Sequence, residues 1–354
     1  MQRSHVYPMA QALLAAILFG ASAPLAKLLL GEIEPVLLAG LLYLGSGLGI
    51  LLYKTLSPVE SRDAEAPINR GDWGWLAGAV FAGGVAAPIL LLISLRNTPA
   101  STASLLLNFE GVATTLIAAL VFKEAVSRYA IWAIACVTLA SILLSWDTSG
   151  QWSLSLGALG IIGACILWGI DNNLTRNISA KDPLMIVIVK GLGAGSFSFV
   201  LALILGNWLP SILIVLGALL LGSLSYGLSI VLFIRAMRGL GAVRTSALFG
   251  TAPLIGTALS FVLFRDALTP LFLIALPLMI IAAALLFREN HEHRHTHEAT
   301  THEHQHRHDD GHHNHDHPGM TSRSLTHSHV HTHEPMEHEH PHLPDIHHRH
   351  SHEA

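Results

Sequence analysis

Long apolar runs alternate with short polar connections from about residue 9 to residue 287. A helix needs about 20 mostly apolar residues to cross a membrane. Ten runs of suitable length lie near residues 9–30, 35–53, 72–94, 100–122, 128–146, 154–175, 183–205, 211–233, 242–264 and 269–287. The pattern predicts an all-α integral membrane fold with ten transmembrane helices.

The apolar pattern stops at Asn290. Residues 291–354 hold 23 of the 24 histidines and almost no large apolar side chains. Many of these histidines alternate with other residues at period two, which is also typical of a strand. A segment without an apolar face has little to bury, however, and this composition favours disorder. We therefore expect residues 289–354 to form a disordered tail outside the membrane fold.

Composition and charge support this division of the chain. Only 12% of the residues are Asp, Glu, Lys or Arg, and the mean hydropathy is +0.51, whereas about 25% are charged in an ordinary soluble domain. Residues 1–290 carry a net charge of +3 and the tail carries −7. Cys136 and Cys165 both lie inside apolar runs, which favours buried free thiols over a disulfide.

The charges of the connections predict the orientation. Lys and Arg accumulate on the cytoplasmic side of a membrane protein. One side of the predicted bundle has twelve of them, and the other has only Lys27, Arg96 and Arg265. With an even number of spans, both termini and the tail would be cytoplasmic.

The two halves of the apolar region resemble each other. Phe19-Gly20 with Lys27 matches Trp168-Gly169 with Arg176, and residues 96–124 align without a gap on residues 238–266. Each repeat has five predicted spans, within 8–147 and 152–288, and an odd number forces the second copy to insert upside down. Inverted repeats are typical of secondary transporters, in which one bundle moves against the other around a central site.

These paired motifs resemble the EamA type of the drug/metabolite transporter superfamily. The resemblance is carried by the motifs above, by Phe122-Lys-Glu124 and Phe264-Arg-Asp266, and by the segment from Arg238 to Pro253. It implies a ten-helix transporter, usually a bacterial exporter of small metabolites, with its site between the repeats. The chain departs from the usual pattern at Glu110-Gly111, where the second half has Ala252-Pro253, and the tail is an addition to it.

Glu110 is the candidate of greatest interest because it lies about ten residues into the fourth predicted span. An ionisable group in hydrocarbon costs at least about 2.5–3.5 kcal/mol on insertion scales. With Asn108 it makes a polar spot in an apolar run. Burial favours the protonated form of a carboxyl, so Glu110 is a candidate for proton coupling or substrate binding. The alternative is a neutral or hydrogen-bonded carboxyl that holds helices together.

Asp171 and Lys190 lie on consecutive predicted spans, at depths of about 7–11 Å from the cytoplasmic side at 1.5 Å per residue. We expect them to pair, directly or through Asn172 or Asn173. The pair would either neutralise two charges for insertion or contribute to a cytoplasmic gate or an anionic-substrate site. Lys27 and Arg176 are expected to anchor the spans at opposite faces, and Trp168 to pack, to lie at the interface or to line the cavity.

The tail is expected to bind transition metals. Imidazole suits zinc, nickel, copper and cobalt, and the interspersed Asp and Glu lower the cost of gathering cations. Such binding should fade at acid pH, where protons compete for the histidines. The candidate ligands are His291, His293, His295, His297, His302, His304, His306, His308, His313, His315, His317, His327, His329, His331 and His333.

Two functions agree with these patterns. The first is a secondary transporter that exports a small metabolite or other small solute, with proton exchange as its possible driving force. The second is an exporter of a divalent transition metal (Zn, Ni or Co) that the tail collects or senses. We expect no enzymatic activity, no required cofactor and no nucleic-acid partner, because the connections show no catalytic constellation; the bilayer and a second copy of the chain are the expected partners.

Overall fold

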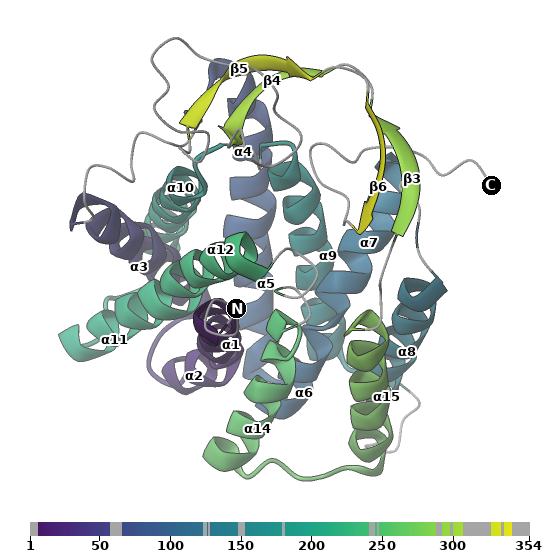
Figure 1. Ribbon diagram of the computed structural model, residues 1–354. Coiled ribbons are helices and arrows are strands. Elements are labelled where there is room, and N and C mark those ends of the chain that lie inside the picture. The colour runs from purple at the N-terminus through teal and green to yellow at the C-terminus, as the bar shows by residue number, and fades with distance from the viewer. Residues whose placement is uncertain are drawn as a thin grey trace.

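The computed structural model describes residues 6–56, 66–122, 126, 128–147, 153–178, 181–240, 245, 248–287, 292–297, 300–306, 327–333 and 336–341. The part up to Phe287 is a bundle of helices (Figure 1). Within it, the described residues form only one pair of two-residue strands, β1 (Trp146–Asp147) and β2 (Ser153–Leu154). An all-α membrane part is therefore confirmed.

Eight helical segments in the described part of the chain are long and apolar enough to cross a membrane. They are Val6–Leu29, Pro35–Leu56, Arg70–Arg96, Ala100–Phe122, Arg128–Ser145, Leu156–Arg176, Pro183–Ile204 and Ile212–Ala236. Two further apolar helices, Ala252–Phe264 and Pro270–Leu285, are shorter. The ninth predicted span began at residue 242, and part of that stretch lies outside the described residues.

Four of the helical segments are interrupted rather than uniform α-helix. The first is divided into α1 (Val6–Gly20) and α2 (Ser22–Leu29), and the fourth into α6 (Ala100–Leu106) and α7 (Phe109–Phe122). The third runs through η2 (Arg70–Asp72), α4 (Trp73–Ala79), the π-helical η3 (Val80–Ala86) and α5 (Ala87–Arg96). The eighth combines α11 (Ile212–Gly222), the π-helical η4 (Ser223–Leu228) and α12 (Ser229–Leu240).

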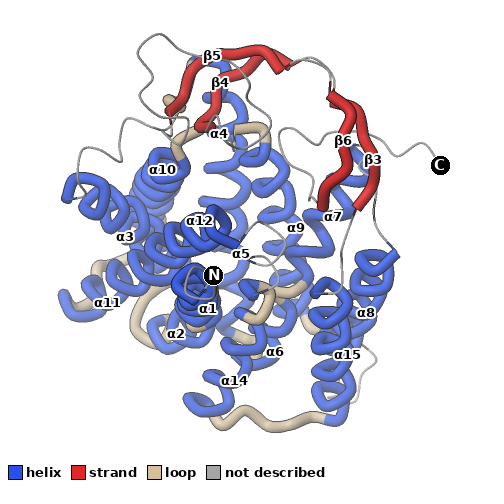
Figure 2. Tube along the Cα trace, in the orientation of Figure 1, coloured by secondary structure: helices blue, strands red, loops and turns tan. Residues whose placement is uncertain are grey.

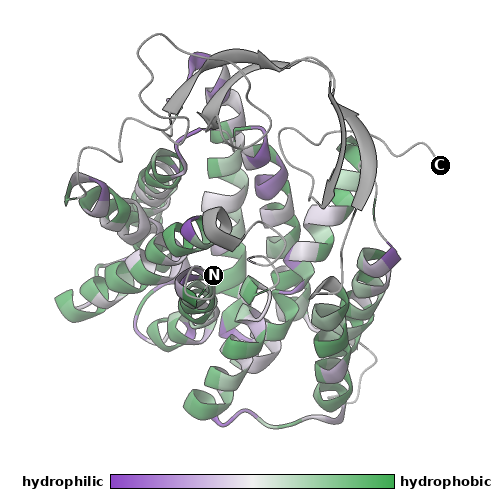
Figure 3. Cartoon of the chain, viewed as in Figure 1, coloured by the Kyte–Doolittle hydropathy of each residue, from purple (hydrophilic) through white to green (hydrophobic). Residues whose placement is uncertain are grey.

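The remaining helices are continuous. They are α3 (Pro35–Leu56), α8 (Arg128–Ser145), α9 (Leu156–Arg176), α10 (Pro183–Ile204), α14 (Ala252–Phe264) and α15 (Pro270–Phe287). Large apolar side chains are exposed along many of the helices, including Phe81 at 61% and Leu120 at 78%. Figure 3 shows that hydrophobic residues predominate along most helices and that a hydrophilic stretch stands out on α9. An apolar exterior is suited to lipid rather than water.

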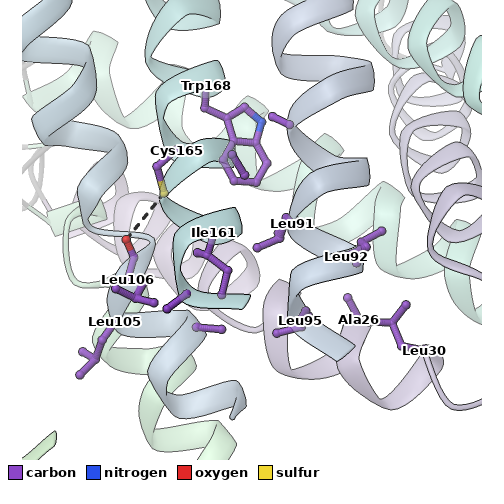
Figure 4. Packing of buried hydrophobic residues seen from close by; sticks show 14 of the residues in the cluster. Ala26, Leu30, Leu91, Leu92, Leu95, Leu105, Leu106, Ile161, Cys165 and Trp168 are labelled. Atoms are coloured by element: carbon purple, nitrogen blue, oxygen red, sulfur yellow. Dashed lines mark hydrogen bonds between the residues drawn. The ribbon is translucent and has the colours of Figure 1, made fainter. Parts of the chain in front are cut away.

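Small residues bring α3 and α10 into close contact. A Cβ added to Gly191 would lie 2.5 Å from the backbone nitrogen of Gly47, and one added to Gly195 would lie 2.4 Å from that of Leu44. Such packing is how helices associate where no hydrophobic force drives them together. Elsewhere, α2, α5, α6 and α9 meet in a buried core where Ile161 and Leu91 face each other (Figure 4).

Parts of the tail differ from the expectation of disorder. Strands β3 (Glu292–His297) and β6 (Met336–Pro341) pair antiparallel, as do β4 (Thr300–His306) and β5 (His327–His333). Figure 2 shows these four strands arching over one end of the bundle. Pairing satisfies the backbone hydrogen bonds of each strand without requiring an apolar face. For the rest of the tail, which lies outside the described residues, disorder stays a prediction.

Candidate functional site

A cavity of about 370 Å³ lies between the two halves of the bundle. It reaches the junction of α6 and α7, and its walls come from α1, α8, α12, α14 and α15. Most of its lining is apolar or glycine. The lining residues are Phe19, Gly20, Ser104, Leu107, Asn108, Glu110, Gly111, Val112, Thr115, Ala130, Ala133, Ile134, Val137, Phe233, Phe249, Gly250, Ala252, Pro253, Ala282 and Ala283.

The break between α6 and α7 positions the two polar residues that the sequence singled out. Leu107 and Asn108 form a turn, and the Asn108 side-chain amide donates to the carbonyl oxygen of Leu105 at 3.1 Å. The Leu105 carbonyl also accepts from the Asn108 backbone N–H at 3.1 Å, so the backbone and the side chain of Asn108 both close the end of α6. Glu110 then falls in the first turn of α7, where the helix dipole favours negative charge.

Glu110 is held by a neighbouring helix. The Asn172 side chain on α9 donates to Glu110 Oε1 at 2.9 Å and to Thr114 Oγ1 at 3.1 Å. The sequence had suggested Asn172 as a bridge between Asp171 and Lys190, but the structure gives it to Glu110. Asn173 instead donates to the backbone oxygens of Thr114 and Gly169.

Asp171 and Lys190 form a direct ion pair, as predicted. Lys190 Nζ donates to Asp171 Oδ1 at 2.6 Å and to Oδ2 at 2.7 Å, and the two side chains are only 17% and 7% exposed. Thr175 adds a hydrogen bond to Oδ1 at 2.9 Å. The pair lies outside the residues that line the cavity, one position along α9 from Asn172.

Gly83, in the π-helical segment η3, makes room for this pair. A Cβ on Gly83 would lie 1.9 Å from Asp171 Oδ2. The Gly83 carbonyl accepts hydrogen bonds from Tyr43 at 2.6 Å and from Trp168 Nε1 at 3.0 Å. A π-helical turn shifts the regular hydrogen-bond ladder and frees a carbonyl for such partners. Trp168 is thus a buried hydrogen-bond donor, and it does not line the cavity.

Polar contacts also join the helices at the end of the bundle where α2, α5 and α14 end and α6 begins. Asp266, just after α14, accepts hydrogen bonds from the Ser101 nitrogen at 2.9 Å and the Ser101 hydroxyl at 2.7 Å. Lys27 donates to the carbonyl oxygen of Thr98, and Arg96 pairs with Glu34 at 2.8 Å. Lys27 therefore links α2 to the loop before α6, a contact more specific than the anchoring role expected for it.

The thiols and the tail histidines complete the candidates. Cys136 and Cys165 are free, and Cys165 packs with its thiol toward the carbonyl oxygen of Leu106 (Figure 4). In the described residues, no group of three or more His, Cys, Asp or Glu could hold a metal ion. Of the tail candidates, His291, His308, His313, His315 and His317 lie outside the described residues, and the other ten lie on strands β3, β4 and β5.

Sequence reasoning missed the partners of two side chains. The Trp168–Gly83 bond depends on a π-helical turn, and the Asn172–Glu110 bond depends on how α7 meets α9. A polar triplet at Asp171–Asn173 inside an apolar span was a usable signal for the second. Close approach of α7 and α9 is seen in Gly169, whose added Cβ would lie 2.9 Å from the Thr114 nitrogen.

Comparison of this chain with known proteins supports a transporter. An uncharacterized transporter of Methanothermobacter thermautotrophicus is 29% identical over 268 residues, which cover 71% of this chain and 78% of that protein. A solved structure, described only as a crystal structure of a protein, shares the fold with a TM-score of 0.57 at 18% identity, over 78% of this chain and 95% of its own. The EamA-like transporter family, whose members are transporters and not enzymes, matches residues 7–146 and 155–288. The chain therefore belongs to the EamA-like transporter family and is a multi-pass membrane transporter.

Proposed function

We propose that the protein is a secondary transporter that exports a small organic solute across the bacterial inner membrane, in exchange for protons. The observation that carries this proposal is the cavity of about 370 Å³ between the two halves, with Glu110 in its wall. A volume of this order is typical of small-molecule sites, which are mostly apolar with a few convergent polar groups. Glu110 would be the group through which solute and proton are exchanged.

Alternating access by two inverted five-helix repeats would supply the movement. The contacts between helices support such a two-fold relation, because equivalent spans contact each other: α3 contacts α10, α8 contacts α15, and the fourth and ninth spans meet through α6 and α14. The largest contacts between non-equivalent spans of the two halves also come in matched pairs, such as α5 with α9 and α12 with α1. These pairs correspond when the first five spans are exchanged for the second five.

Local irregularities follow the same relation. The break at Leu107–Asn108 aligns to within one residue with the turn at Gly250–Thr251, and the third span of each half carries a π-helical segment. Gly20 lies close to α14 just as Gly169 lies close to α7. Repeated irregularities of this kind support a duplicated unit better than repeated apolar runs, which any spanning helix shows.

The predicted orientation would make this an inward-facing or occluded state. Ala130 and Ile134 lie near the start of α8, and Ala282 near the end of α15, on the side assigned to the cytoplasm; all three line the cavity. The Asp266–Ser101 and Lys27–Thr98 contacts close the opposite side. A solute would therefore load from the cytoplasm, as export requires.

Reconstituted full-length protein tests the proposal. Liposomes would be loaded with a protein-free, low-molecular-weight extract of the expressing cells, and the compounds that remain inside would be measured by mass spectrometry. We expect loss of one class of organic compound, faster under an imposed pH gradient, with Glu110→Gln slower by at least tenfold. Glu32→Gln, which removes an exposed carboxylate in the loop after α2, is the matched control. Equal retention in protein-containing and empty liposomes would overturn the proposal.

Metal export is the weaker alternative. The cavity lining offers Glu110, Asn108 and hydroxyls, and borderline-soft metals prefer imidazole and thiolate ligands. Cellular zinc, nickel and cobalt would be measured in metal-stressed cells with the full chain, with Glu110→Gln and with a chain stopped after Asn290. A fall in one metal that needs Glu110 would replace the organic solute with that metal.

We also propose that the tail binds zinc, nickel, cobalt or copper and serves as a metal buffer or sensor. The strand register supports paired sites, because His302, His304 and His306 are the Cα partners of His331, His329 and His327. Facing residues of two strands lie about 4.5–5.5 Å apart at Cβ, which suits shared coordination. β3 and β6 add two more His–His partners, His293 with His340 and His295 with His338.

These histidine pairs can be tested by moving the histidines of β5 one position along the strand without changing the composition of the tail. In the variant, His327, His329 and His331 exchange places with Ser328, Val330 and Thr332, so each histidine moves one position along the strand and to its other face. We expect fewer tight zinc sites in equilibrium dialysis of the full chain at the same number of histidines. Superimposable binding curves would mean that the tail binds metal as an unstructured chain.

A further inference from the structure

We infer that the transported solute is an organic monocation, with an ammonium group held by Glu110 and an apolar body of aromatic size held by the rest of the cavity. This inference rests on the proposed function and deepens it by naming the substrate class. It is carried by three observations: the charge of the lining, the ring cluster on its wall, and a buried hydroxyl without a partner.

The described part of the lining carries a single charge. Among the described residues that line the cavity, Glu110 is the only one with an ionisable side chain. Lys190, whose partner Asp171 precedes Asn172 on α9, is engaged at 2.6 and 2.7 Å by both oxygens of Asp171. In the described residues, the side chain that donates to the Glu110 carboxylate is the neutral amide of Asn172. Since no described cation forms an ion pair with Glu110, a proton or a bound cation would neutralise this carboxylate.

Aromatic rings face the same space. The rings of Phe19 and Phe249 have centroids 5.2 Å apart, and those of Phe233 and Phe249 are 4.9 Å apart. All three residues line the cavity, together with alanines and glycines. Ring faces attract cations and stack on aromatic ligands, so this wall suits an apolar ring that carries a positive charge. A carboxylate solute would instead meet the charge of Glu110 in an apolar space.

The unpartnered hydroxyl is that of Ser104. It lines the cavity, is 1% exposed, and its Oγ makes no hydrogen bond among the described residues. A buried polar atom in this condition is uncommon and calls for a ligand or a water. Ser104 lies against Gly256 of α14, whose added Cβ would be 3.0 Å from Ser104 Oγ. An ammonium N–H or a hydroxyl on the solute could fill this position.

Exchange would follow from competition for one carboxylate. In the empty, protonated state the proton resides on a Glu110 oxygen; when the ammonium binds, that proton leaves to water and the carboxylate pairs with the cation. After release of the cation on the other side, a proton binds in its place. One cation would move outward for each proton moved inward, so the cycle is electroneutral and would respond to a pH gradient but not to membrane potential.

Three compounds with the same ring and different charges test the inference: phenethylamine, 3-phenylpropanoate and 3-phenylpropanol. Calorimetric titration of the full chain in nanodiscs, with a chelator present, would measure binding at a pH where the amine is charged. Titration in two buffers of different ionisation enthalpy would count the protons released. We expect binding of the amine with proton release, at least tenfold weaker binding of the other two, and loss of both amine binding and proton release in Glu110→Gln but not in Glu32→Gln.

Other outcomes separate the two proposals. If 3-phenylpropanoate or 3-phenylpropanol binds as tightly as the amine, or if Glu110→Gln leaves amine binding unchanged, the monocation inference is wrong. Export of another class of compound from the extract-loaded liposomes, still dependent on Glu110, would then leave the transporter proposal intact. Loss of Glu110-dependent export as well would overturn both.

Discussion

Glu110 and Asp171 are two carboxylates on helices that touch, yet they meet different surroundings. The Asp171 side chain is 7% exposed, accepts hydrogen bonds from Lys190 and Thr175, and occupies the space that Gly83 leaves. Glu110 faces a cavity and receives one amide hydrogen bond from Asn172. A buried charge that is fully paired holds a structure in one arrangement, whereas an incompletely paired charge is available for exchange. From this comparison we propose a structural role for Asp171 and a functional role for Glu110.

The largest expected effect is that of Asp171→Asn. It leaves the Lys190 ammonium buried without its counter-charge, and breaking a buried pair in this way costs about 3–5 kcal/mol. We expect much less protein in the membrane fraction and a markedly lower melting temperature in detergent. Asp171→Asn combined with Lys190→Met removes both charges and should restore most of the stability. If the single variant is as stable as the parent, Asp171 is not the structural member of the comparison.

Gly83→Ala should be the next largest. The new methyl group would lie 1.9 Å from Asp171 Oδ2, so η3 or the ion pair must move, and overpacking of this kind costs about 1–3 kcal/mol. Thermal unfolding in detergent measures the loss. Gly74→Ala, in the same span, is the control because nothing lies within 4 Å of its added Cβ. Equal melting temperatures for the two variants would contradict close packing of η3 on α9.

The sequence predicted the Asp171–Lys190 pair because opposite charges at similar depths on consecutive spans have few other partners in hydrocarbon. It also predicted that Glu110 and Asn108 lie together, because they are two residues apart in one apolar run. It did not predict that Asn172 serves Glu110 rather than the ion pair. The partner of Asn172 depends on how α9 is rotated about its axis relative to α7. The apolar pattern does not determine this rotation, because the span is apolar on most sides.

The same limit applies to the helix irregularities and the tail. The π-helical segments η3 and η4 contain ordinary apolar and small residues, so only tertiary contacts reveal them. The ends of the apolar runs were predicted well where a proline begins a helix, as at Pro35 and Pro183. In the tail, composition predicted disorder, whereas the strands depend on pairing between segments more than 20 residues apart.

Asn172→Ala tests the contact between the Glu110 site and the Asp171–Lys190 pair. It removes the amide that donates to Glu110 and Thr114, while the Asp171–Lys190 pair keeps its own bonds. A net loss of about 0.5–1.5 kcal/mol for one hydrogen bond corresponds to amine binding at Glu110 that is weaker by a factor of about 2 to 13. Proton release on amine binding measures it. Asn177→Ala, which removes a bond to the backbone of the same helix, should leave that release unchanged; equal losses would indicate a general disturbance of α9.

The smallest expected effect is that of Glu110→Gln on stability. Gln keeps the shape and can still accept from Asn172 through its carbonyl oxygen, and no described cation loses its partner. The free energy of unfolding should therefore change by less than about 0.5 kcal/mol, as for substitutions away from packed or paired groups, even though transport is lost. Thermal unfolding of Glu110→Gln beside Asp171→Asn measures the contrast directly. A loss of stability comparable to that of Asp171→Asn would make Glu110 a second structural carboxylate, and its failure in transport would then report misfolding rather than exchange.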